Sequence, residues 1–172
     1  MKRVLFAVGT AVVVAGALVP SSAPAVVRLS TGSSAQLEAG VVAHLNGLRT
    51  RRGLRPLRLS RELASAARHH ASDMAQGGFC GHESANGAAF RGRLQRFYTR
   101  RPGWRLWSAG ENVLCHPRGL SAPAAIGQWL GSPSHRANML SPTWREVGVA
   151  AVHGTFNGEE FVFVTADFGV RR

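Results

Sequence analysis

Residues 129–140 read Trp-Leu-Gly-Ser-Pro-Ser-His-Arg-Ala-Asn-Met-Leu, and Glu146-Val147-Gly148-Val149 follows shortly after. The Ser132-Pro133 step interrupts a helix that the pattern predicts over Pro123 to Leu130, because proline cannot continue a helix from within. His135 then lies at the start of the next helical turn. The Val- and Ala-rich stretch from Glu146 onward predicts a buried strand. The chain therefore passes from helices to sheet here, with one imidazole at the junction.

Two earlier motifs also place one titratable group beside small or turn-forming residues. They are Phe79-Cys80-Gly81-His82 and Gly110-Glu111-Asn112. With His135 and Glu146, the chain thus offers two imidazoles and two carboxylates that local structure cannot bring together. A fold that gathers them would suit proton transfer or a divalent metal ion.

The ordered set of motifs resembles the CAP superfamily, also called the SCP or pathogenesis-related-1 domain, and in particular its bacterial secreted branch. The similarity begins near Asn46-Gly47-Leu48-Arg49 and Gly53-Leu54-Arg55-Pro56-Leu57 and ends at Thr165-Ala166-Asp167-Phe168-Gly169. It implies an α+β fold, a three-layer α-β-α sandwich with an antiparallel sheet.

The residue patterns agree with that expectation. Leu37, Val41, Leu45 and Leu48 form one apolar stripe of a helix that starts near Ser34. A second helix, capped by Ser60 and ended by Gly77-Gly78, carries His70 on its apolar face, where we interpret it as a hydrogen-bonded core residue. Asn157-Gly158 predicts a tight hairpin in a β-rich final third.

The resemblance assigns roles to three residues and leaves a fourth position empty. In eukaryotic members, two His and two Glu line a cleft. His82, Glu111 and His135 match three of these four residues. The second family Glu lies three residues after a Trp, and here that position is Ser132. Glu146 is the only nearby acid after His135. We expect it either to reach the cleft or to pair with Arg136 or Arg145.

The 172 residues divide into a predicted export signal and one domain. Residues 1–25 have a positive start, an apolar run and the sequence Ala23-Pro24-Ala25, which are typical of a cleaved secretory signal. An uncleaved membrane anchor is the alternative, although the run is short for a span. We expect a flexible lead over 26–33 and a single domain over 34–172, with no membrane span after cleavage.

The net charge of +12 admits two interpretations. Attraction to an anionic polymer or lipid is one, and a preference for Arg over Lys on a solvated surface is the other. Lys2 is the only lysine. No nucleic-acid-binding signature is present, so we expect no nucleic-acid partner.

Two cysteines, Cys80 and Cys115, lie close to His82 and Glu111 in the sequence. Export would permit a disulfide between them. Two free thiols or zinc ligands are the other possibilities, but no Cys-x-x-Cys pair supports zinc binding through sulfur. A disulfide would tie the two motifs together.

Two functions from different classes remain. The first is a secreted, monomeric, non-enzymatic binding module whose cleft holds a lipid-like, sterol-like or anionic cell-wall ligand, with His82 and His135 binding Zn²⁺ or another divalent metal. The second is a metal-assisted hydrolase acting on peptide or wall material, with His82, Glu111, His135 and Glu146 as its catalytic cluster. The missing second Glu favours the first.

Overall fold

A computed structural model describes residues 33–100 and 102–172. The expected signal over 1–25 and nearly all of the lead over 26–33 lie outside those residues. The elements are α1 (Ser34–Thr50), β1 (Arg58–Leu59), α2 (Arg61–Gly77), α3 (Phe90–Phe97), β2 (Trp107–Pro117), α4 (Ala122–Gly131), α5 (Pro133–Leu140), β3 (Glu146–Phe156) and β4 (Glu159–Arg171).

The sheet runs in the order β1-β3-β4-β2, which makes β2 an edge strand. The three long strands pair antiparallel, as expected. β1 pairs in parallel with the start of β3 through only two residues. The sheet is therefore antiparallel with one short parallel edge.

The turn between β3 and β4 is the predicted two-residue hairpin. Asn157 and Gly158 have φ values of 51° and 83°. Two successive positive φ values are what a type I′ turn requires, and Asn-Gly satisfies them at low cost.

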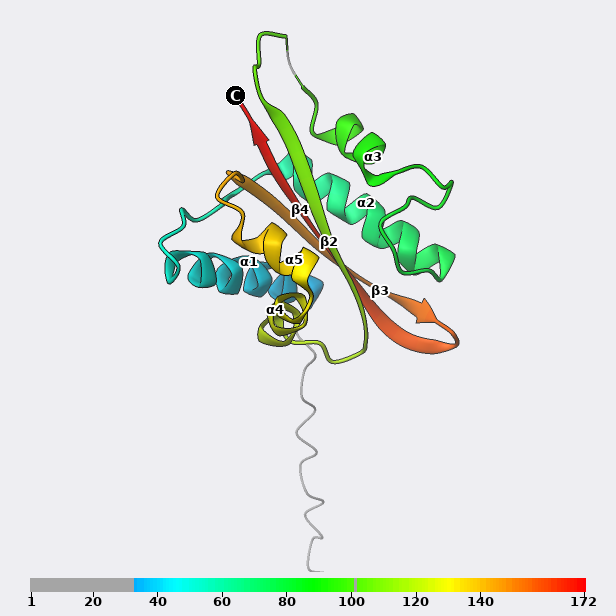
Figure 1. Ribbon diagram of the computed structural model, residues 1–172. Helices are drawn as coiled ribbons and strands as arrows, with labels where there is room; N and C mark the ends of the chain where they lie inside the picture. The colour runs from blue at the N-terminus through cyan, green and yellow to red at the C-terminus, as the bar shows by residue number, and fades with distance from the viewer. Residues whose placement is uncertain (1–32, 101) are drawn as a thin grey trace, which may run out of the picture.

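Helices cover both faces of the sheet and make the three layers that the resemblance implies (Figure 1). α1, α4 and α5 lie on one face, and α2 and α3 on the other. The predicted stripe of α1 is buried against the first face. β4 is covered on both sides, since Val164 and Phe168 pack toward α1 while Phe163 packs near Met74 of α2.

The ends of α2 are set by its sequence. The Ser60 side chain accepts a hydrogen bond from the Leu63 amide, and Gly78 ends the helix with a left-handed φ of 60°. The helix buries Leu63, Ala67, His70 and Met74, the face predicted from the sequence.

α2 approaches β3 so closely that one position of the strand has no room for a side chain. A Cβ atom on Gly148 would lie 2.0 Å from the backbone nitrogen of Ala64. Gly148 thus determines how near the helix can lie to the sheet.

Within the described residues, the structure contains no helix whose length and hydropathy would let it cross a membrane.

We expect Gly148→Ala to lower the free energy of unfolding by roughly 1–3 kcal/mol or more, because the added methyl forces α2 away from β3. Gly127→Ala is the matched control, since Gly127 lies within α4 and a Cβ there meets no atom within 4 Å. That control should gain about 0.5–1 kcal/mol from helix propensity. Urea unfolding of both variants measures the difference. If Gly148→Ala were as stable as Gly127→Ala, the close packing of α2 on β3 would be contradicted.

Candidate functional site

Glu111 is the buried centre of the candidate site. It lies on β2 with only 3% of its surface exposed, and its side chain points toward the layer of α2 and α3. Both carboxylate oxygens are engaged: one bonds His82 and the other bonds Arg93. A buried carboxylate is tolerated because such partners compensate its lost hydration.

His82 is held on the irregular segment between α2 and α3. Its Nδ1 lies 3.0 Å from Oε1 of Glu111, and about half of its side chain is exposed. Because a carboxylate can only accept, Nδ1 carries the hydrogen, and in the neutral tautomer that this selects the lone pair lies on Nε2. The imidazole thus presents its free nitrogen to the surface.

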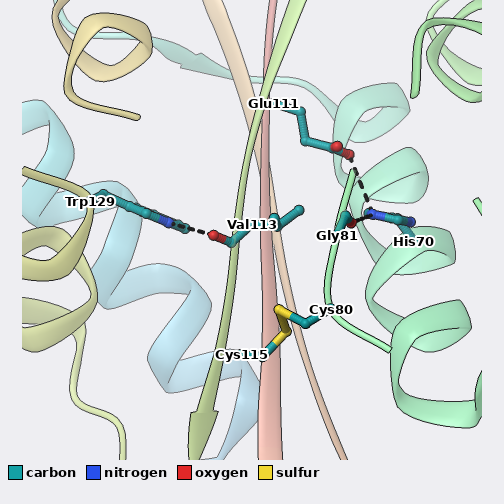
Figure 2. Close-up of a disulfide and its surroundings, with 7 residues drawn as sticks. All are labelled: His70, Cys80, Gly81, Glu111, Val113, Cys115 and Trp129. Atoms are coloured by element: carbon teal, nitrogen blue, oxygen red, sulfur yellow. Dashed lines mark hydrogen bonds and ion pairs between the residues drawn. A yellow bond between two sulfur atoms is a disulfide. The ribbon is translucent and has the colours of Figure 1, made fainter. Parts of the chain in front are cut away.

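A disulfide fixes this segment to β2. Cys80 and Cys115 are bonded, with their Cα atoms 6.1 Å apart, which confirms the predicted pairing. Figure 2 shows the disulfide on the α2 side of the strand, while Trp129 approaches from the other side and donates to the Val113 carbonyl. β2 is therefore anchored from both layers beside the site.

Arg93 of α3 completes the binding of Glu111. Its guanidinium also donates to the Ser84 hydroxyl at 2.7 Å and to the His82 carbonyl at 3.4 Å. The side chain is almost fully buried. Sequence reasoning missed it, because one arginine among many on a short helix carries no distinguishing pattern.

His70 lies beneath the same segment. Its Nε2 donates to the Gly81 carbonyl at 2.8 Å and lies 4.0 Å from Oε2 of Glu111 (Figure 2). Burial is the main cause that lowers the pKa of its imidazole, so the ring is held neutral. This is the hydrogen-bonded core residue that the sequence predicts, and it supports the loop that carries His82.

Asp167 brings a second buried carboxyl to the cluster. It is the cross-strand partner of Glu111 on β4, and no donor reaches either of its oxygens. Burial and the Glu111 carboxylate raise the pKa of Asp167 well above its ordinary value, although Arg93 opposes the shift. Both causes favour the protonated, neutral form of Asp167. The sequence alone assigns no role to this residue.

His135 reaches the site from the opposite layer, around the free edge of β2. Its ring centroid lies 6.0 Å from that of His82. Burial and His82 lower the pKa of His135, which favours a neutral ring. The Asn112 side chain donates to the His135 carbonyl, and Asn138 donates to the Glu111 carbonyl, each at 3.0 Å. These two amides bind α5 to the strand edge.

Glu146 takes part in a different cluster. It accepts a hydrogen bond from Tyr98 and lies 3.6 Å from both Arg58 and Arg171. Among the described residues, none of its hydrogen bonds or ion pairs joins His82, Glu111 or His135. Its ionic partners are also not the two arginines considered from the sequence.

Ser132, at the position of the second family Glu, offers no substitute carboxylate. Its hydroxyl lies 3.3 Å from that of Ser134 at the exposed start of α5. The structure thus brings together three of the four sequence-predicted site residues, His82, Glu111 and His135.

The two imidazoles suit metal ligation in their form and orientation, but the number of protein ligands is small. Neutral rings are the form that binds a metal, and a carboxylate on Nδ1 orients such a ligand. In the described part of the chain, no group of three or more His, Cys, Asp or Glu is placed to hold an ion together. Any metal here would rely on two imidazoles, with the remaining positions left to water or a ligand. The 79–87 segment lines a cavity of about 570 Å³ beside His82.

Comparison with known proteins agrees with this architecture. The family described as the cysteine-rich secretory protein family, CAP, matches residues 42–168. The uncharacterized protein YkwD of Bacillus subtilis is 29% identical over 127 residues, which cover 73% of this chain and 46% of that protein.

Two of the solved structures that are similar to this chain illustrate the match. An extracellular protein containing an SCP domain from Bacillus anthracis shares 29% identity, with 78% of this chain and 42% of that chain covered and a TM-score of 0.58. An outer surface protein from Borrelia burgdorferi shares 19% identity and the fold, with coverage of 77% and 90% and a TM-score of 0.60. The chain spans less than half the length of the curated relatives that it matches.

We expect Cys80→Ser/Cys115→Ser to lower the free energy of unfolding by up to about 4 kcal/mol, because the disulfide closes a loop between cysteines 35 residues apart. Urea unfolding measures the loss. Dithiothreitol should destabilise the wild type by a similar amount and leave the variant unchanged. A wild type indifferent to reductant would contradict this account.

Asp167 should make stability depend on pH. Above about pH 4 an unfolded Asp is ionised, whereas the raised pKa keeps the proton of Asp167 on the folded protein to a higher pH. The free energy of unfolding therefore falls as the pH rises toward the raised folded pKa, by about 1.4 kcal/mol per pH unit. Asp167→Asn should remove this decline, so that its advantage over the wild type grows with pH.

Urea unfolding from pH 4 to 8 tests this expectation. Asp73→Asn is the control. It makes the same exchange on the partly exposed side of α2, where the carboxylate lies 3.7 Å from His69. If wild type and Asp167→Asn gave parallel curves, Asp167 would not hold the proton.

Proposed function

The chain belongs to the cysteine-rich secretory protein (CAP) family, and on that premise we propose that it is an exported, non-enzymatic binding module. Its cleft holds a divalent metal ion at His82 and His135 and, beside the ion, an anionic group of the ligand. The observation that carries the proposal is the pair of imidazoles whose ring centroids lie 6.0 Å apart, one of them oriented by Glu111.

The state of the carboxylates supports binding over chemistry. Glu111 is hydrogen-bonded through both oxygens, to His82 and to Arg93. A general base must be free to take a proton from a substrate, and a carboxylate engaged in this way suits orientation of His82 instead. Glu146, the other candidate base, bonds Tyr98 and lies near Arg171. Both observations weigh against the hydrolase alternative.

The proposed metal ligands are the free Nε2 of His82 and the ring of His135. A bound ion would supply Lewis acidity and attract an anionic ligand group. The protein's own contributions are to keep His135 neutral through burial and to fix the tautomer of His82 through Glu111.

The proposed export and the proposed ligand class are supported by similarity, by the predicted signal and by charge. The similar Bacillus anthracis protein is described as extracellular, and the sequence predicts a secretory signal. A cationic chain with a net charge of +12 suits an anionic cell-wall ligand. Lipid-like or sterol-like ligands remain the second class to test, and we expect a monomer.

Isothermal titration of metal-free protein with Zn²⁺ tests the site. We expect a dissociation constant of about 1 μM or tighter, lost in His82→Ala and His135→Ala because each removes one of two protein ligands. His44→Ala, on the exposed face of α1, is the control and should bind as the wild type does.

Zn²⁺ binding that survives both cleft substitutions would place the ion elsewhere and reject the proposal. Zn²⁺-dependent cleavage of peptide or wall fragments that is lost in the same variants would favour the hydrolase.

A further inference from the structure

A second pocket, distinct from the His82 site, is lined by arginines. It has a volume of about 460 Å³ and is lined by Gly53, Leu54, Arg55, Pro142, Arg145 and Arg172. These residues come from the segment after α1, the segment before β3 and the residue that follows β4. None of them belongs to the cluster around Glu111.

A fourth arginine lies buried next to this pocket. Arg49 is fully buried, and its guanidinium donates to the carbonyls of Arg55, Met139 and Ser141. These bonds fix the 53–55 segment to the end of α5. Because carbonyls carry no net charge, they satisfy the donors of Arg49 but leave its positive charge uncompensated.

Arg145 is arranged in a similar way. One of its terminal nitrogens donates to the carbonyls of Pro142, Thr143 and Trp144, at 2.6 to 3.1 Å. Burial and the neighbouring Arg145 lower the pKa of Arg49, as mutual repulsion between two cations requires. Both arginines thus hold the pocket in shape, and both contribute positive charge to it.

Arg55 and Arg172 are exposed at the rim. Among the residues that the structure describes, no ion pair joins a carboxylate to any of these four arginines. These four neighbouring cations repel one another, and in a partly enclosed pocket water screens that repulsion incompletely. An anion at this point would relieve it.

We propose that the pocket formed by Arg55, Arg145 and Arg172 above Arg49 binds a phosphate group of a ligand. Guanidinium groups match phosphate oxygens in paired hydrogen bonds, which a single ammonium cannot make. Arg49 and Arg145 are fixed by carbonyls before the ligand arrives, so that only the two rim side chains must be ordered on binding.

Inorganic pyrophosphate is the first probe, titrated calorimetrically into the protein at low ionic strength. We expect Arg55→Gln/Arg172→Gln to weaken binding by about tenfold or more, as loss of charge-assisted hydrogen bonds implies. The side chains of both residues are exposed, so the fold should persist. Arg61→Gln/Arg96→Gln removes the same charge from exposed positions on α2 and α3 and should change the affinity less than about threefold.

Cosedimentation with phosphatidylglycerol vesicles distinguishes a lipid headgroup from a soluble phosphate. Binding to vesicles alone that is lost in Arg55→Gln/Arg172→Gln would assign the pocket to a headgroup. Equal weakening in both double variants would reduce the effect to overall charge and overturn the proposal. Absence of binding to both probes would also overturn it, whatever the Zn²⁺ titration shows.

Discussion

The hydrogen bonds of the Glu111 carboxylate are the interaction on which the candidate site depends. They join β2 to α3 through Arg93 and to the 79–87 segment through His82. The disulfide from Cys115 and the bond from His70 to Gly81 hold the same segment from below. Removal of the carboxylate would leave Arg93 buried without a countercharge, which is a costly state for any folded protein.

Much of the architecture could be predicted from local patterns. The stripe of α1, the caps of α2 and the Asn157-Gly158 turn follow from residue spacing or turn chemistry and are confirmed. The Cys80–Cys115 bond, which predicted export permitted among other possibilities, is also confirmed. The resemblance to CAP proteins, which gave the order of the layers, is confirmed as well. β1 could not be predicted, because two exposed residues make no periodic pattern.

The buried partners of the site were harder to find, for a physical reason. Arg93 and Asp167 acquire their roles only through contacts across the sheet and between layers, which local residue patterns do not record. Glu146 is the opposite case, a residue that the sequence suggested for the site and that the structure places in another cluster. Its proximity in sequence to His135 suggested a place in the cleft, but at the start of β3 it bonds Tyr98 of the α3 layer. Sequence proximity is a poor guide where a chain passes from one layer to another.

The raised pKa of Asp167 favours its neutral form, and this affects the charge that the cluster presents to a ligand. With that carboxyl neutral, Arg93 and Glu111 balance each other. A dication held between the two imidazoles would therefore find no surplus negative charge in the protein beneath it. Electroneutrality would have to come from the solution side, through hydroxide or an acidic group of the bound molecule. Metal and ligand would then bind with positive cooperativity, each raising the affinity for the other.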